Sequence, residues 1–186
     1  DNGSYTATFT VSDGAAQTSD TLTVTVTNVA PTVNAGANIS GIEGSSVTFT
    51  GSFSDPGTGD THTYLWQFGN GQQVTGTLTP TYTYPQDGIY TATLTVTDDD
   101  GGIGTDTTTV TIGNVPPTVD AGTPQSANEG VSISFDGTVS DPGADTLTYL
   151  WTFGDGDTAS TVDTTHTYTT PGVYTVSLTV NDGTTF

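Results

Sequence analysis

The chain has 186 residues, with no Lys or Arg and 20 acidic residues, which give a formal net charge of −20. A chain without basic side chains neither neutralises nucleic-acid phosphates nor is attracted to anionic lipid, so we expect no nucleic-acid partner. It also contains no stretch of about 18 apolar residues, so no membrane insertion is expected of this segment.

Two common covalent crosslinks are excluded by composition. The chain has no Cys for a disulfide and no Lys for an internal isopeptide bond. A small domain without a large core needs another stabilising device, and a bound metal ion is a leading candidate. The bias toward Thr, Ser, Gly and Asp is typical of an extracellular or cell-surface protein of a bacterium or archaeon, and that is the location we expect.

Residues 1–27 predict two strands. Apolar side chains alternate with polar ones from Tyr5 to Val11 and again at Val24 and Val26, and a period of two residues indicates a strand with one apolar face. Two strands alone are not independently stable. We interpret this segment as the C-terminal strands of a truncated repeat.

Residues 28–113 predict one complete repeat of six or seven short strands. Strong turn formers such as Asp55-Pro56-Gly57 separate the strands. The strands are marked by Val47, Phe49 and Phe53, by Tyr64, Trp66 and Phe68, by Tyr90, Ala92, Leu94 and Val96, and by Val110 and Ile112.

Residues 114–186 predict a second repeat that lacks its final strand. The segment Asn28–Val33 returns 86 residues later as Asn114–Val119, and Tyr64–Gly69 returns as Tyr149–Gly154. A fixed period of this size is typical of an array of like units. Its strands are marked by Ile133, Phe135 and Val139, by Tyr149, Trp151 and Phe153, and by Tyr174, Val176, Leu178 and Val180.

This pattern predicts an all-β fold made of tandem antiparallel sandwiches, with Trp66 and Trp151 at the centres of their cores. The junctions at residues 27–32 and 113–118 are short and contain Pro. Such connections limit bending, so we expect an extended array.

The repeated motifs resemble the PKD domain family, whose hallmark is a Trp-Asp-Phe-Gly-Asp-Gly run followed by Gly-x-Tyr and a Leu-Thr-Val-x-Asp strand. The resemblance implies immunoglobulin-like sandwiches that occur as extracellular spacers, in surface-layer and adhesin proteins, and as accessory modules of secreted proteases, collagenases and chitinases. Some members bind calcium near the N-terminal end of the domain. The matching runs here are Trp66–Gly71, Gly88–Tyr90, Leu94–Asp98, Trp151–Gly156, Gly172–Tyr174 and Leu178–Asp182. Gln67, Thr152 and Asn70 depart from the hallmark and weaken any metal role for that loop.

Repeated oxygen-bearing side chains predict one Ca²⁺ at each junction, since calcium prefers six to eight oxygen ligands. The alternative is that these residues are only turn formers and solvated charges. The candidate ligands are Asn28, Asp55 and Asp98 for one site and Asn114, Asp141 and Asp182 for the next, with Glu43 and Glu129 as weaker candidates.

Other functional signals are few. His62 and His166 occupy different positions in their repeats, and we interpret both as strand-surface or core-edge residues. Tyr82 and Tyr84 are candidates for exposed ligand contacts. No nucleophile-elbow motif is present, and we do not expect an enzyme.

We therefore predict a noncatalytic extracellular stalk or filament segment, structural or adhesive, with calcium stiffening its junctions. The expected partners are neighbouring repeats of the same chain and a surface glycan or protein ligand. Self-association into fibres by strand addition is a further hypothesis. The alternative function is an accessory module of a secreted hydrolase that binds polysaccharide or collagen.

Overall fold

A computed structural model describes residues 2–183 of the chain. These residues form strands, turns and loops without any helix, so the expectation of an all-β chain is confirmed. Consequently, none of the described segments offers a helix of the length and apolarity needed to cross a membrane.

The chain divides into two compact units. Among the described residues, unit 1 comprises residues 2–39, 48–82 and 89–110, and unit 2 comprises residues 40–47, 83–88 and 111–183. Two short segments of the repeat expected at 28–113 therefore belong to the same unit as residues 111–186.

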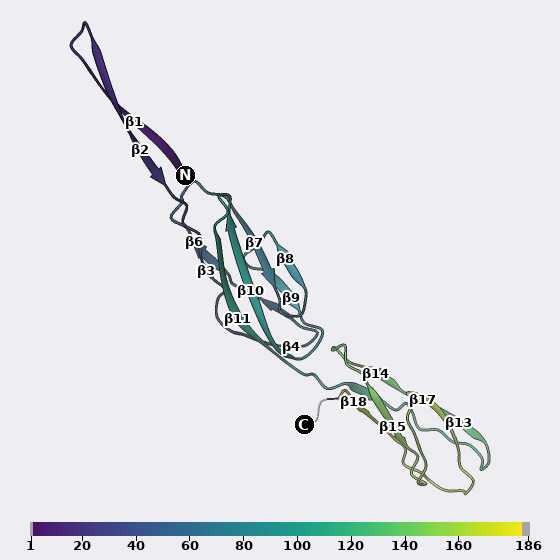
Figure 1. Cartoon of the computed structure of the whole chain (residues 1–186). Helices are drawn as coiled ribbons and strands as arrows, with labels where there is room; N and C mark the ends of the chain where they lie inside the picture. Colours follow the sequence, from purple (N-terminus) through teal and green to yellow (C-terminus); the bar gives the residue numbers. More distant parts are fainter. Residues whose placement is uncertain (1, 184–186) are drawn as a thin grey trace. The chain divides into compact units, whose positions relative to one another are not determined.

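The N-terminal segment is a long β-hairpin (Figure 1). Strands β1 (Gly3–Ser12) and β2 (Gln17–Val26) pair antiparallel along their whole length, from Gly3 opposite Val26 to Ser12 opposite Gln17. Every residue of both strands is exposed, and Phe9 is 73% exposed. The two predicted strands are confirmed, and fibre formation through them stays a prediction.

The next nine strands form one five-stranded sheet and two strand pairs (Figure 1). The sheet has the order β4-β11-β10-β7-β8, while β3 pairs with β6 and β5 pairs with β9. These strands are β3 (Thr32–Asn34), β4 (Ile39–Ile42), β5 (Ser46–Thr48), β6 (Ser52–Ser54), β7 (His62–Gln67), β8 (Gln73–Thr75), β9 (Thr81–Thr83), β10 (Gly88–Asp98) and β11 (Ile103–Gly113).

The C-terminal strands repeat most of this pattern. Strand β12 pairs with β14 and β13 pairs with β17, while β16, β15 and β18 form a three-stranded sheet in that order. These strands are β12 (Thr118–Asp120), β13 (Ser132–Asp136), β14 (Thr138–Ser140), β15 (Thr148–Thr152), β16 (Thr158–Ala159), β17 (Asp163–Thr167) and β18 (Ser177–Asn181).

Each unit has an aromatic core centred on its tryptophan, as predicted. Trp66 and Trp151 are completely buried, and their indole Nε1 atoms donate hydrogen bonds to the carbonyl oxygens of Leu78 (3.2 Å) and Val162 (3.1 Å). In unit 1 the ring of Phe49 lies 4.8 Å from that of Trp66. Burial of the indole and satisfaction of its N–H are both expected of a core tryptophan.

Three details of the sequence interpretation were wrong. Residues 47–53 form two strands with different partners, because the chain leaves β5 and crosses to β6 at Gly51, whose N–H bonds the carbonyl of Leu78. The equivalent crossing at Gly137 separates β13 from β14. Tyr174 and Val176 precede β18 rather than lying in it. Tyr84 is completely buried, so it is not an exposed ligand contact.

Candidate metal centres

The first acidic cluster joins the loop after β6 to the end of β10. One carboxylate oxygen from each of Asp55, Asp60 and Asp98 lies within 4.8 Å of the other two. The antiparallel register places Asp98 opposite His62, so strand pairing brings the last residue of β10 beside the first residue of β7. Two side chains of the predicted first site, Asp55 and Asp98, are therefore brought together.

Hydrogen bonds favour the ionised form of the Asp98 side chain. It is 4% exposed, and the Asn28 side-chain amide donates to its Oδ2 at 2.9 Å. The N–H groups of Gly102 and Asp100 donate to its Oδ1 at 2.7 and 3.0 Å. The Asn28 hydrogen bond, supported by these backbone donors and by the His62 imidazole, holds the pKa of Asp98 below its usual value against the effect of burial. The predicted association of Asn28 with Asp98 is thus present in the fold.

A histidine provides the first cluster with a donor. The Nε2 atom of His62 lies 2.9 Å from Asp55 Oδ2, and the Asp55 side chain is only 3% exposed. The other Asp55 oxygen, Oδ1, accepts the Gly57 N–H at 2.9 Å and closes a turn. Burial, followed by the negative charges of neighbouring carboxylates, raises the pKa of Asp60. The sequence did not signal the contact of His62 with Asp55, which arises from the turn.

The second cluster lies entirely in unit 2. One carboxylate oxygen from each of Glu43, Asp141 and Asp145 lies within 4.8 Å of the other two. Two unit charges at this distance repel by about 3.5 kcal/mol even at an effective dielectric constant of about 20. Glu43 is completely buried. A cation at this cluster would remove a large electrostatic cost.

Two of the carboxylate oxygens in this cluster lack hydrogen bonds. Asp141 Oδ2, Asp145 Oδ2 and the amide oxygen of Asn114 are buried and have no partner among the described residues. Asp141 Oδ1 accepts the Gly143 N–H at 2.7 Å, as the equivalent Asp55 oxygen accepts that of Gly57. Buried polar atoms are nearly always paired, so the free oxygens of Asp141 and Asp145 are suited to accept a further donor or a cation. The donor set fits a hard cation such as Ca²⁺.

Asn114 and Asp182 reproduce the contact of Asn28 and Asp98. The Asn114 side-chain amide donates to Asp182 Oδ2 at 2.8 Å, and Asp182 is 7% exposed. The same polar pair therefore connects the start of the first repeat to the end of β10, and the start of the second repeat to the residue after β18.

The remaining predicted ligands are placed differently from one another. Glu43 lies with Asp141 and Asp145, whereas Glu129 is exposed and joins none of the acidic groups within residues 2–183. The sequence interpretation missed Asp60 and Asp145. Both follow an Asp-Pro-Gly turn by a few residues, and this shared feature was the available signal.

A separate group lies in the hallmark loop of the second repeat. His166 Nε2 lies 2.7 Å from Asp155 Oδ2, and the His166 hydrogen bond lowers the pKa of Asp155. Asp157 completes the group, but Asp155 and Asp157 are exposed. The hydrogen bond between His166 and Asp155 explains this exposed group without a metal ion, so we assign it no metal site.

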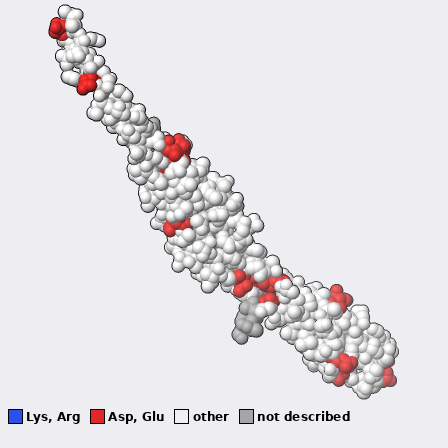
Figure 2. Space-filling view, in the orientation of Figure 1, with Lys and Arg blue, Asp and Glu red and all other residues white. Residues whose placement is uncertain are grey.

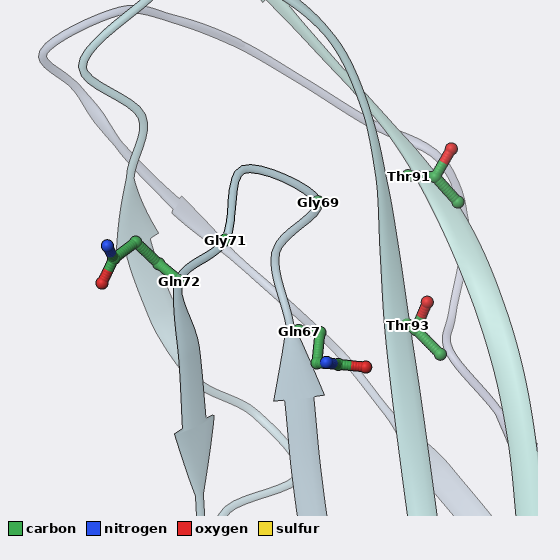
Figure 3. Close-up of a pocket in the computed structure, with 6 residues that line it drawn as sticks. All are labelled: Gln67, Gly69, Gly71, Gln72, Thr91 and Thr93. Carbon is green, nitrogen blue, oxygen red and sulfur yellow. The ribbon is translucent and has the colours of Figure 1, made fainter.

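A shallow depression of about 280 Å³ lies beside the turn that joins β7 to β8. Figure 3 shows the Gln67 side chain extending toward the strand that carries Thr91 and Thr93, in agreement with the pairing of Thr93 with Gln67. The lining offers amides and hydroxyls without a carboxylate, imidazole or thiol. Its residues are Gln67, Gly69, Gly71, Gln72, Thr91 and Thr93.

Acidic side chains gather in small separate groups on the surface, as Figure 2 shows. Because the sequence contains no Lys or Arg, no basic side chain except the two histidines can balance these groups.

The strand order and the two tryptophan-centred cores define tandem antiparallel β-sandwich modules. Residues 28–112 and 114–185 match the family model described as PKD domain, so the chain belongs to the PKD domain family. The resemblance inferred from its motifs is confirmed.

Two curated relatives match a short part of the chain. The chain is 47% identical over 55 residues to the collagenase ColA of Bacillus cereus, an alignment covering 30% of this chain and 6% of the relative. It is 43% identical over 54 residues to the pre-pro-metalloprotease PrtV of Vibrio cholerae, covering 29% of this chain and 6% of that protein. The matched stretch is thus a small fraction of either protease.

Among solved structures, the PKD1 domain of the Vibrio cholerae metalloprotease PrtV is 37% identical. The match covers 45% of this chain and 98% of that domain, with a TM-score of 0.39.

Proposed function

We propose that the chain is a noncatalytic segment of tandem PKD domains in an extracellular or cell-surface bacterial or archaeal protein. It serves as a spacer or stalk that holds other parts of a longer protein apart. The observation that carries this proposal is the repetition of a whole module, including its buried tryptophan and its polar pair at Asn28–Asp98 and Asn114–Asp182.

The composition supports an extracellular setting. The chain has no Cys, Lys or Arg, and each unit depends on a small aromatic core. Extracellular fluid commonly supplies millimolar calcium, and the carboxylate clusters offer oxygen ligands of the kind that calcium prefers. We propose that Ca²⁺ binds the Asp55–Asp98 and Asp141–Asp145 clusters and stiffens the junctions between repeats.

Small-angle X-ray scattering of the whole chain tests the spacer. In millimolar Ca²⁺ we expect the distance distribution of an elongated particle, and in EGTA a broader distribution with a larger spread of conformations. A compact, globular profile in calcium would contradict the stalk. An elongated profile that EGTA leaves unchanged would support the spacer proposal and refute the proposal that calcium stiffens the junctions.

The second candidate function is an accessory module of a secreted hydrolase that binds polysaccharide or collagen. Two observations favour it. The relatives that match the chain include a collagenase and a metalloprotease, and unit 2 contains an open groove of about 620 Å³. Aromatic side chains in the groove, Phe135, Tyr168 and Tyr174, provide apolar contacts suited to such a ligand.

Pull-down of the chain on insoluble chitin, cellulose and collagen separates the two functions. Retention on one of these polymers, with loss on Tyr174→Ser, would support the accessory module. A chain that stays in the supernatant with all three would leave the spacer as the better account.

A further inference from the structure

We propose that Asn70 is a site of spontaneous covalent modification, at which the side-chain amide becomes a carboxylate through a cyclic imide formed with the backbone nitrogen of Gly71. Water is the co-reactant, and the reaction requires no enzyme. The site lies in the turn between β7 and β8 of unit 1 (Figure 3), away from the acidic clusters, so the proposal is independent of the spacer function and of cation binding.

The reaction has two steps, and both conserve atoms. In the first, the Gly71 nitrogen attacks the side-chain carbonyl carbon of Asn70, a C–N bond closes a five-membered imide, and the bond from Cγ to Nδ2 breaks. The attacking nitrogen loses its proton, and the leaving amine takes up a proton and departs as ammonia. In the second step, water opens the imide. Opening at the side-chain carbonyl gives aspartate, and opening at the backbone carbonyl gives isoaspartate.

Gly71 leaves the attacking nitrogen accessible. The residue is exposed, its φ is +88°, and a Cβ built on it would meet no other atom within 4 Å. Because glycine has no side chain, nothing on this residue shields its nitrogen, and its backbone has the conformational freedom that ring closure requires.

The Asn70 side chain is held close to that nitrogen. Its Oδ1 accepts the Gln72 N–H at 3.2 Å, which places the carboxamide beside the Gly71 backbone that lies between the two residues. Its Nδ2 donates to the Tyr82 hydroxyl at 2.9 Å. Two groups that the fold holds together react at a smaller cost in entropy than the same groups in a flexible chain.

The second repeat contains the product of this reaction at the corresponding position. Asp155 precedes Gly156, which also has a positive φ (+107°) and open space around its Cβ position. Asp155 Oδ1 accepts the Asp157 N–H at 3.1 Å. Asn70 Oδ1 accepts the Gln72 N–H in the same way. The turn therefore accommodates aspartate without a change of fold.

The aromatic neighbour of Asn70 also suits the product. Tyr82 stacks on Phe68 with ring centroids 4.1 Å apart, and its hydroxyl faces the Asn70 amide. In the second repeat, His166 lies against Asp155 at the same place. A tyrosine hydroxyl accepts a hydrogen bond from an amide and donates one to a carboxylate, so this contact survives the conversion. Conversion adds one negative charge to a chain whose net charge is −20.

Incubation of the whole chain at mildly alkaline pH, followed by peptide mass spectrometry, tests the site. Because the chain has no Lys or Arg, chymotrypsin replaces trypsin, and the peptide from Gly69 to Tyr82 contains Asn70 as its only asparagine. The peptide 1–5 contains the other Asn-Gly of the sequence and is the internal reference. We expect the Asn70 peptide to gain the mass of an amide-to-acid exchange at a rate within about tenfold of the reference.

Two variants test the mechanism and the product. Gly71→Ala places a methyl group beside the attacking nitrogen and should slow the conversion at Asn70 at least about fivefold, while the reference peptide converts at the wild-type rate. Asn70→Asp supplies the product directly. It should keep the near-ultraviolet circular dichroism of the tryptophans and a melting temperature within about 3 °C of the wild type.

Each measurement has an outcome that overturns part of the proposal. An Asn70 peptide that stays unchanged while the reference converts would refute the site. Equal rates in the wild type and in a folded Gly71→Ala would refute the imide with Gly71. A melting temperature of Asn70→Asp lowered further than expected would refute the inference that the turn accommodates the carboxylate.

Discussion

A single methyl group added at Gly51 or Gly137 should destabilise the corresponding unit. A Cβ at Gly51 would lie 2.6 Å from Leu94 Cδ2, 2.9 Å from the Leu78 carbonyl oxygen and 3.0 Å from Trp66 Cζ2. The Leu78 carbonyl already accepts the Gly51 N–H and the indole N–H. Neither of the two glycines has a left-handed φ, so the effect of alanine is steric rather than conformational.

The expected magnitude follows from two opposing effects. Overpacking a close-packed core costs about 1–3 kcal/mol. Replacing Gly by Ala also lowers the entropy of the unfolded chain, which offsets about 0.4–1 kcal/mol of this cost. We expect a net loss of about 1–2 kcal/mol for Gly51→Ala, or a midpoint lowered by about 5–15 °C for a unit of this size. Gly137→Ala should lose slightly less, because its Cβ would lie 3.3 Å from Trp151 Cζ2.

Differential scanning calorimetry of the whole chain measures the effect, since Gly51 lies in unit 1 and Gly137 in unit 2. Gly113→Ala is the matched control, because a Cβ there would meet nothing closer than 3.8 Å. Equal melting temperatures for Gly51→Ala, Gly137→Ala and the control Gly113→Ala would refute the reasoning.

Three further changes test other parts of the fold. Asp98→Asn should make the stability of the fold less dependent on pH in acid. Because the pKa of Asp98 is lowered in the fold, its carboxylate stabilises the fold at pH values above the usual pKa of 3.8, and this contribution is lost as the pH falls through the folded pKa. Urea titrations at roughly pH 6 to 2.5 measure the difference. Gly69→Ala should destabilise by about 2 kcal/mol or more in urea, because Gly69 has a φ of +82° and a Cβ would lie 2.6 Å from the Thr91 carbonyl oxygen. Phe9→Ser should lower the free energy of unfolding in urea by no more than about 0.5 kcal/mol, because Phe9 is 73% exposed. A larger loss would show that the Phe9 side chain is buried in solution.

The strands and the core could be predicted because they follow local rules. Alternating apolar residues between Tyr90 and Val96 identify a strand and the face that is buried, and Ala92, Leu94 and Val96 are indeed fully buried. The same alternation from Tyr5 to Val11 predicted the strand correctly, although there the apolar face is exposed. Periodicity identifies a face but does not show what covers it.

Local rules failed where the chain changes partner. The run from Val47 to Phe53 keeps its alternation across Gly51, yet its two halves pair with different strands. A pattern of period two carries no information about which strand lies opposite. The crossing depends on the close approach of Gly51 to Trp66, and that approach exists only after the core has formed.

The sequence predicted that acidic side chains gather near the turns, but not which of them lie together. The motif that places Asp55 and Asp141 after a strand is repeated, so their shared position could be read from the sequence. Glu43 and Glu129 occupy the same kind of Glu-Gly turn, but Glu43 is fully buried and Glu129 is exposed. Their difference is set by the loop at residues 141–145 that packs on the first of them, which no local pattern encodes.

The two clusters differ in one neighbour, because His62 lies against Asp55 whereas Leu147 stands at the corresponding position of the second repeat. Exchanging this residue should exchange the proposed response of the two clusters to Ca²⁺. Leu147→His should give Asp141 the donor that Asp55 has in His62, and should therefore reduce the rise in the melting temperature of unit 2 when Ca²⁺ is added. His62→Leu should increase the corresponding rise in unit 1, because Asp55 would lose its donor. Calorimetry with 5 mM CaCl₂ or with EGTA, roughly a saturating against a metal-free condition, measures both rises. Equal calcium responses in the wild type and both variants would show that the histidine and the cation do not compensate the same charge.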